Sequence, residues 1–152
     1  MDADRRTGLD AALLLAALAV AWLTLTPAGG SGWAWGAPLT ELRWYATGLD
    51  SEATVLQLVG NLLLLVPLAV LAVLRWPRLG TPQRLGTPQR LAALAVATGT
   101  GIELLQWALP LGRVVSPVDA ALNATGAVAA GLVVALAAGR PTRRRVARLS
   151  GG

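Results

Sequence analysis

The residues best suited to chemistry lie between the last two apolar runs of the sequence. Glu103 and Gln106 close one run, Arg113 lies in the turn, and Asp119 and Asn123 open the next run. An ionisable side chain inside a membrane span costs roughly 2.5–3.5 kcal/mol on insertion scales, so such residues are functional-site candidates by default. A carboxylate could act as a general base. The guanidinium suits bidentate recognition of phosphate or carboxylate.

Helical spacing groups the polar residues of three apolar runs into pairs. The pairs Gln57/Asn61 and Asp119/Asn123 are four residues apart and Glu103/Gln106 is three apart, so each pair shares one helix face. At about 1.5 Å per residue, all of them lie roughly 3–11 Å inward from the same end of their helices. We therefore expect a shared polar pocket that binds a ligand through Asn61, Glu103, Gln106, Arg113, Asp119 and Asn123.

A purely structural interpretation competes with this pocket. Buried amides join membrane helices at about 0.6 kcal/mol per hydrogen bond. In that interpretation Arg113 forms an ion pair with Asp119 or Glu103 that holds the tight turn. Two carboxylates and an arginine at the level of three amides favour a site, but both interpretations stay open at this stage.

The composition indicates a multi-pass membrane protein. Of the 152 residues, 55% are hydrophobic and 14% are charged, whereas soluble domains carry about 25% charged residues. Mean hydropathy is +0.58. The net charge of +5 comes from 13 arginines that fall mostly in loops, so we expect no nucleic-acid partner. The absence of Cys and His removes thiolate chemistry and the commonest metal ligand. We predict no catalytic residue, metal or cofactor.

Four apolar runs predict the fold, an all-α domain over residues 1–152. The expected spans are residues 9–26, 54–75, 91–110 and 117–138, and residues 139–152 form a basic, disordered tail. A signal peptide is the alternative for the first run. Pro67 removes a backbone hydrogen bond and should bend the second span. The tandem hexapeptide in residues 78–89 indicates a duplication in a tolerant loop.

The longest loop, residues 27–53, is rich in tryptophan. Aromatic rings favour the headgroup level of a bilayer, so we expect this loop along the membrane interface, with a short amphipathic helix around residues 38–47. An aromatic lid over a ligand is the alternative interpretation.

Arginine placement predicts the orientation. Eleven of the 13 arginines belong to the N-terminus, the loop after the second span and the tail, and only Arg43 and Arg113 lie on the other side. The positive-inside rule then places both termini in the cytoplasm and the pocket at the outer face.

The polar pattern resembles the VanZ-like family, named for the teicoplanin-resistance protein of vancomycin-resistance gene clusters. The family pattern has a Glu, a Gln three later, an Arg after a short turn, then an Asp and an Asn four apart with a Gly after the Asn. Here these are Glu103, Gln106, Arg113, Asp119, Asn123 and Gly126, preceded by Asn61 and Pro67. The aromatic and Gly that often flank the Pro are Leu65 and Ala69 here. The resemblance covers residues of about 57–131 and implies a small multi-pass protein of the bacterial plasma membrane, linked in some members to lower teicoplanin susceptibility.

Three functions fit these observations. The first is a non-enzymatic protein, surrounded by the lipid bilayer, that binds a polar headgroup or lipid-linked ligand at the outer leaflet. The second is an enzyme acting on a lipid-linked envelope substrate with Glu103 or Asp119 as general base. Ser116 is the nearby hydroxyl, although a helix N-cap also explains it. The third is an accessory subunit that docks a membrane protein partner.

Overall fold

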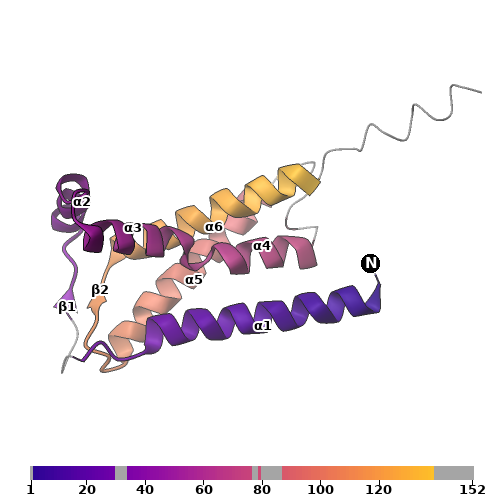
Figure 1. The fold of residues 1–152 in the computed structure, drawn as a ribbon, viewed down its shortest axis with the longest axis horizontal. Helices are drawn as coiled ribbons and strands as arrows, with labels where there is room; N and C mark the ends of the chain where they lie inside the picture. Colours follow the sequence, from indigo (N-terminus) through magenta and orange to yellow (C-terminus); the bar gives the residue numbers. More distant parts are fainter. Residues whose placement is uncertain (1, 30–33, 77–78, 80–86, 139–152) are drawn as a thin grey trace, which may run out of the picture.

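The computed structural model describes residues 2–29, 34–76, 79 and 87–138. Helices dominate these residues, with one short strand pair at one end (Figure 1). The helices are α1 (Ala3–Leu25), α2 (Pro38–Thr47), α3 (Glu52–Leu64), α4 (Val66–Arg75), α5 (Thr87–Ala108) and α6 (Pro117–Ala138), and the strands are β1 (Ala34–Trp35) and β2 (Val114–Val115). The predicted all-α class is confirmed. The predicted tail, 139–152, and most of the repeat at 78–89 lie outside the described residues.

Four helical stretches in the described ranges are long and apolar enough to cross a membrane. They are Ala3–Leu25, Glu52–Arg75, Gln89–Ala108 and Pro117–Ala138, with hydropathies of 2.0, 2.3, 1.3 and 1.9. This confirms the four predicted spans, although the helix ends differ by a few residues. Helix α1 begins at Ala3, before the expected start at residue 9, because charged residues also form helix. Its first turn includes the hydrogen bond from Arg6 N to Asp2 O at 3.2 Å. Helix α5 ends before Pro110, whose ring disfavours helical geometry in the residue preceding it.

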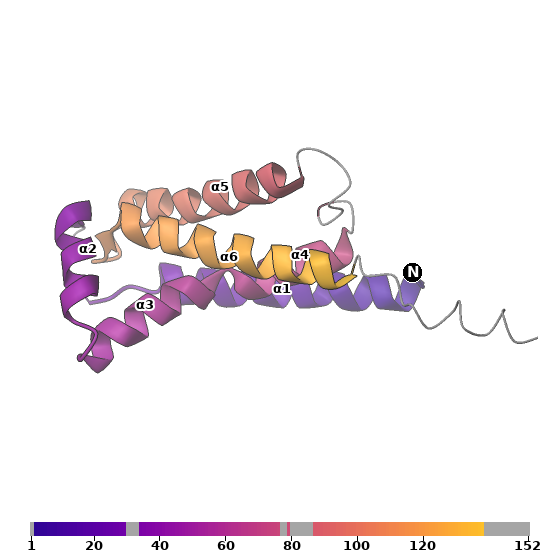
Figure 2. The ribbon, with the colours of Figure 1, turned by 90° about the horizontal axis from the view of Figure 1, so that it is seen from above.

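The second span is interrupted at the predicted proline. Helix α3 ends at Leu64, and α4 starts at Val66 with Pro67 in its first turn. Proline has no N–H to donate to the carbonyl four residues earlier, and its ring clashes with that carbonyl. Figure 2 shows α3 turning away from the line of α4. This turn sets the direction of α3, which carries Gln57 and Asn61.

Helix α6 is the central element, because α3, α4 and α5 all pack on it. Small residues allow these close contacts. A Cβ on Gly126 would collide with the backbone carbonyl of Leu62 on α3, and a Cβ on Gly99 would come within 2.9 Å of the Ala120 carbonyl oxygen. Helix α1 packs on α4 and α5 instead. The residues at the start of α6 are therefore held at fixed positions relative to α3 and α5.

Helix α2 lies across the end of the bundle remote from the N-terminus (Figure 1). Its bounds confirm the helix predicted over residues 38–47, and it packs on α3 and α6. The strands β1 and β2 pair in parallel beside it, with Ala34 opposite Val114 and Trp35 opposite Val115. The sequence did not predict this pair, because two residues are too few to show an alternating pattern.

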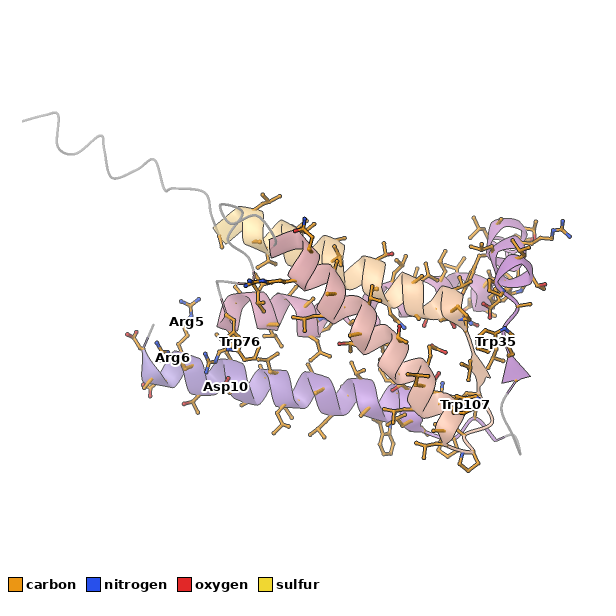
Figure 3. All side chains as sticks on the ribbon, turned by 180° about the vertical axis from the view of Figure 1, so that it is seen from behind. Arg5, Arg6, Asp10, Trp35, Trp76 and Trp107 are labelled. Carbon is orange, nitrogen blue, oxygen red and sulfur yellow. The ribbon has the colours of Figure 1, made fainter. Side chains whose placement is uncertain are left out.

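The two ends of the bundle carry different side chains. Figure 3 shows Arg5, Arg6, Asp10 and Trp76 at one end, and Trp35 and Trp107 at the other. At the first end, Arg75 Nε donates to Asp10 Oδ1 at 2.7 Å and joins α4 to α1. Tryptophan at both ends of apolar helices is the distribution expected at the two surfaces of a membrane.

Candidate functional site

A cavity of about 570 Å³ lies where α1, α3, α5 and α6 meet the turn after α5. Its polar wall includes all six residues proposed from the sequence: Asn61, Glu103, Gln106, Arg113, Asp119 and Asn123. Gln57, Thr24 and Gly112 also line it. The structure thus brings residues from three separate spans and a turn around one space.

Asp119, in the first turn of α6, receives hydrogen bonds from two other helices. Tyr45 Oη on α2 donates to Asp119 Oδ1 at 2.7 Å, and Gln57 Nε2 on α3 donates to Oδ2 at 3.4 Å. Asn61 Nδ2 in turn donates to Tyr45 Oη at 3.5 Å. Burial, followed by the bond to Asp119, raises the pKa of the Tyr45 phenol. The phenol therefore keeps its proton and acts as a donor to the carboxylate.

Ser116 joins three acidic residues of different helices. Its backbone N–H donates to Glu103 Oε2 on α5 at 2.6 Å, and its hydroxyl donates to Glu41 Oε2 on α2 at 2.6 Å. The same hydroxyl accepts from the backbone N–H of Asp119 at 3.0 Å. This last bond is the helix N-cap that the sequence suggested. Ser116 is 1% exposed, so its contacts are structural and its hydroxyl is closed to an incoming substrate.

Arg113 binds the end of α1. Its Nε donates to the Thr26 carbonyl at 3.0 Å and its Nη2 to the Leu23 carbonyl at 2.9 Å. The ion pair with Asp119 or Glu103 considered from the sequence is therefore wrong. The last carbonyls of a helix have no partner within the helix and carry partial negative charge, so they attract a guanidinium. The same contact occupies the Nε/Nη2 edge that would bind a phosphate in bidentate fashion.

Gln106 also bonds to the end of α1. It is 6% exposed, and its Nε2 donates to the Thr24 carbonyl at 2.9 Å. Gln106 and Arg113 together satisfy carbonyls of the last turn of α1. For these two residues the helix-joining interpretation describes the contacts that the structure contains.

Asn123 differs from the other amides. It is 2% exposed, and its Oδ1 accepts no hydrogen bond within the part of the chain that the structure describes. Leaving a buried acceptor unpaired costs about 1–3 kcal/mol, so native structures rarely tolerate one without a reason. Asn123 is one of the residues that line the cavity.

Glu103 belongs to two cavities. Besides the polar cavity it lines a second one of about 510 Å³ between α5 and α6. The walls of this second cavity are mainly apolar: Trp35, Val96, Thr100, Leu104, Trp107, Val115, Pro117, Ala120, Ala121 and Ala124. Glu103 is 8% exposed. This buried carboxyl group thus belongs to the lining of both spaces.

Sequence reasoning missed the contribution of α2. Glu41 and Tyr45 are four residues apart and share the helix face that meets α6. That spacing was the available signal, but the interpretation of the aromatic loop as an interfacial segment did not include contacts of these two side chains with the other helices. The described residues contain no group of three or more acidic, His or Cys side chains able to hold a metal ion.

Comparison with known proteins agrees with the resemblance noted in the sequence. The model of the VanZ/LLP1 family matches residues 13–138, which covers all the cavity residues named above. No curated protein and no solved structure matches the chain. The family match extends over most of the chain and includes three of its apolar helices and the second half of the first. The chain therefore belongs to the VanZ/LLP1 family.

Proposed function

We propose that this membrane protein binds the polar headgroup of a lipid, or a lipid-linked ligand, in the cavity at the start of α6. The observation that carries the proposal is Asn123, whose buried Oδ1 has no donor among the described residues and lies in the wall of that cavity. A ligand that supplies a donor would remove the cost of the unpaired acceptor. The six residues proposed from the sequence form the wall around it.

The size and position of the cavity support a lipid. Ligand pockets commonly measure about 300–1,000 Å³, and this one measures about 570 Å³. Glu103 is shared with the mainly apolar cavity between α5 and α6. A ligand with both a polar and a hydrocarbon part suits such a pair of neighbouring spaces.

The arginine distribution supports an orientation for the protein. Eleven of 13 arginines belong to the N-terminal segment, the segment between the second and third spans and the segment after the fourth, and by the positive-inside rule we assign these segments to the cytoplasm. The cavity then faces the outer leaflet of the bacterial plasma membrane. An effect on teicoplanin susceptibility would follow if the ligand is part of the cell envelope.

The geometry gives less support to the two alternative functions, an enzyme and an accessory subunit. A hydrolytic or transfer reaction through Ser116 would need an accessible hydroxyl, and that side chain is 1% exposed. Asn123 lies in the wall of a cavity, and not on an outer surface where a partner protein would dock.

Lipid retention tests the proposal. The protein, purified from a bacterial membrane in mild detergent, is analysed by native mass spectrometry beside the Asn123→Ala variant. We expect retained lipid on the parent and its loss from the variant. Thr125→Ala is the matched control, because Thr125 is exposed on α6 and bonds only to Ala121 O at 2.7 Å. Equal retention by all three proteins would refute a ligand site at Asn123.

A phenotype provides an independent test. In a host where the intact chain lowers teicoplanin susceptibility, Asn123→Ala and Glu103→Gln should restore susceptibility at equal membrane levels. The Gln at 103 can still accept from the Ser116 N–H, so it changes the charge while keeping that contact. Full protection by both variants would argue against a role of the cavity in the phenotype.

A further inference from the structure

Several hydrogen-bond donors in the wall of the polar cavity are directed at protein acceptors. Arg113 Nε and Nη2 donate to carbonyls of Thr26 and Leu23, and Gln106 Nε2 donates to Thr24 O. An amide beside a backbone carbonyl must present its nitrogen, since two carbonyl oxygens cannot bond to each other. These contacts use two of the five N–H groups of Arg113 and one of the two of Gln106 to hold α1 in place.

The donors on α2 and α3 are engaged in the same way. Gln57 Nε2 and Tyr45 Oη donate to Asp119, and Asn61 Nδ2 donates to Tyr45 Oη. Each bond joins two elements across the end of the bundle. The wall of the cavity thus uses its donors to connect its own helices.

Two buried acceptors of the wall have capacity left. Asn123 Oδ1 has no donor among the described residues. Glu103 uses Oε2 to accept from the Ser116 N–H, and a carboxyl group keeps further acceptor lone pairs beside this one bond. Both side chains are at least nine-tenths buried and both line the cavity. The cavity wall therefore contains two deeply buried side chains with unused acceptors.

The formal charges point in the same direction. Two acidic residues, Glu103 and Asp119, line the cavity with one basic residue, Arg113. Glu41 lies just behind them, on Ser116. A phosphate in this space would meet these carboxylates, and the Nε/Nη2 edge of the Arg113 guanidinium is occupied by carbonyls of α1. A cationic donor would meet acceptors instead.

We propose that the group recognised in the cavity is an ammonium, carried by an amine-bearing lipid headgroup, that donates to Asn123 Oδ1 and Glu103. This inference rests on the proposed function, because it names the headgroup class for the same site. An ammonium has three donors and no acceptor, which matches a wall with spare acceptors. The lipid phosphate then lies outside the acidic wall.

The test compares lipids that differ only in the headgroup. Phosphatidylethanolamine, its N-acetylated form, phosphatidylglycerol and phosphatidic acid, all with the same acyl chains, are titrated separately into the delipidated full-length protein and the bound fraction is read by native mass spectrometry. N-acetylation removes the charge and leaves one N–H. A hydrogen bond to a charged group contributes about 1.5–3 kcal/mol, and each tenfold change in affinity corresponds to about 1.4 kcal/mol. We therefore expect phosphatidylethanolamine to bind at least roughly tenfold more tightly than the other three lipids.

Variants then separate this inference from the proposed function. Asn123→Ala and Glu103→Gln should each reduce the preference for phosphatidylethanolamine, while Thr125→Ala should keep it. Tighter binding of phosphatidylglycerol or phosphatidic acid to the parent would overturn the ammonium assignment and leave a headgroup site standing. Binding of no lipid above the level of the Asn123→Ala variant would overturn both. The comparison of lipids on the parent protein needs no variant, so it decides the assignment even if a substitution prevents folding.

Discussion

The bond between Tyr45 and Asp119 should hold α2 onto the bundle, and Tyr45→Phe tests this directly. The substitution removes one hydroxyl that donates to Asp119 Oδ1 at 2.7 Å and accepts from Asn61 at 3.5 Å. Tyr45 is 7% exposed, whereas Asp119 is half-buried and can recover part of its hydration. Hydrogen bonds to charged groups contribute about 1.5–3 kcal/mol, so we expect the lower end, about 1.5 kcal/mol.

Hydrogen exchange in detergent or nanodiscs measures this loss at α2. A destabilisation of about 1.5 kcal/mol corresponds to roughly tenfold faster exchange, and it should be confined to Pro38–Thr47 if α2 opens locally. Thr47→Ala is the matched control, because the Thr47 hydroxyl bonds only within α2, to Arg43 O at 2.8 Å.

A double-mutant cycle with Asp119→Asn assigns the effect to the pair. The cycle should give a coupling free energy of about 1 kcal/mol or more between the two residues. Exchange in α2 that stays within twofold of the parent in Tyr45→Phe would refute the view that this bond holds the helix.

Three further predictions follow from the same contacts. Tyr45 is the one tyrosine of the chain and its pKa is raised, so the tyrosinate absorbance should appear at a pH above the ordinary midpoint of about 10. The protonated phenol stabilises the fold fully below this ordinary midpoint, and its contribution is lost as the pH rises through the raised pKa. Asp119→Asn should lower the pH midpoint of the absorbance change. Gly126→Ala should lower the free energy of unfolding by about 3 kcal/mol, because the backbone of α3 blocks the new methyl group. Gly60→Ala, which has open space around it, should be neutral or stabilising. Equal midpoints of thermal unfolding in detergent for the two variants would contradict this. Arg113→Ala should destabilise the last turn of α1 by about 1–2 kcal/mol through its two carbonyl bonds, seen as faster exchange there, and unchanged exchange would exclude the capping role.

Local sequence signals predicted the elements well. The apolar runs gave four spans, Pro67 gave the interruption between α3 and α4, and Ser116 gave the N-cap of α6. These features depend on hydropathy over about 20 residues or on the backbone chemistry of one residue. Neighbours in the chain are enough to decide them, so no knowledge of packing is required.

The polar spacing also indicated which residues would meet, though not their partners. Asn61, Glu103 and Asn123 line one cavity, as residues on facing stripes at equal depth should. The sequence suggested a carboxylate partner for Arg113, but its guanidinium donates to backbone carbonyls at the end of α1. Charged side chains can be identified from the sequence. Which element binds the partial negative charge at the end of a helix depends on how the helices pack.

The amino-acid sequence by itself determined a membrane protein with four apolar helices, a helix in the aromatic loop and polar stripes on three of the spans. Only the tertiary structure decided that Tyr45 and Glu41 of α2 reach α6, that β1 pairs with β2, and that Asn123 Oδ1 has no donor among the described residues. The physical reason is that helical periodicity specifies which side chains share a face of one helix. The rotation and translation of each helix against its neighbours depend instead on close backbone contacts such as Gly126 against Leu62, and these decide which hydrogen bonds form between elements.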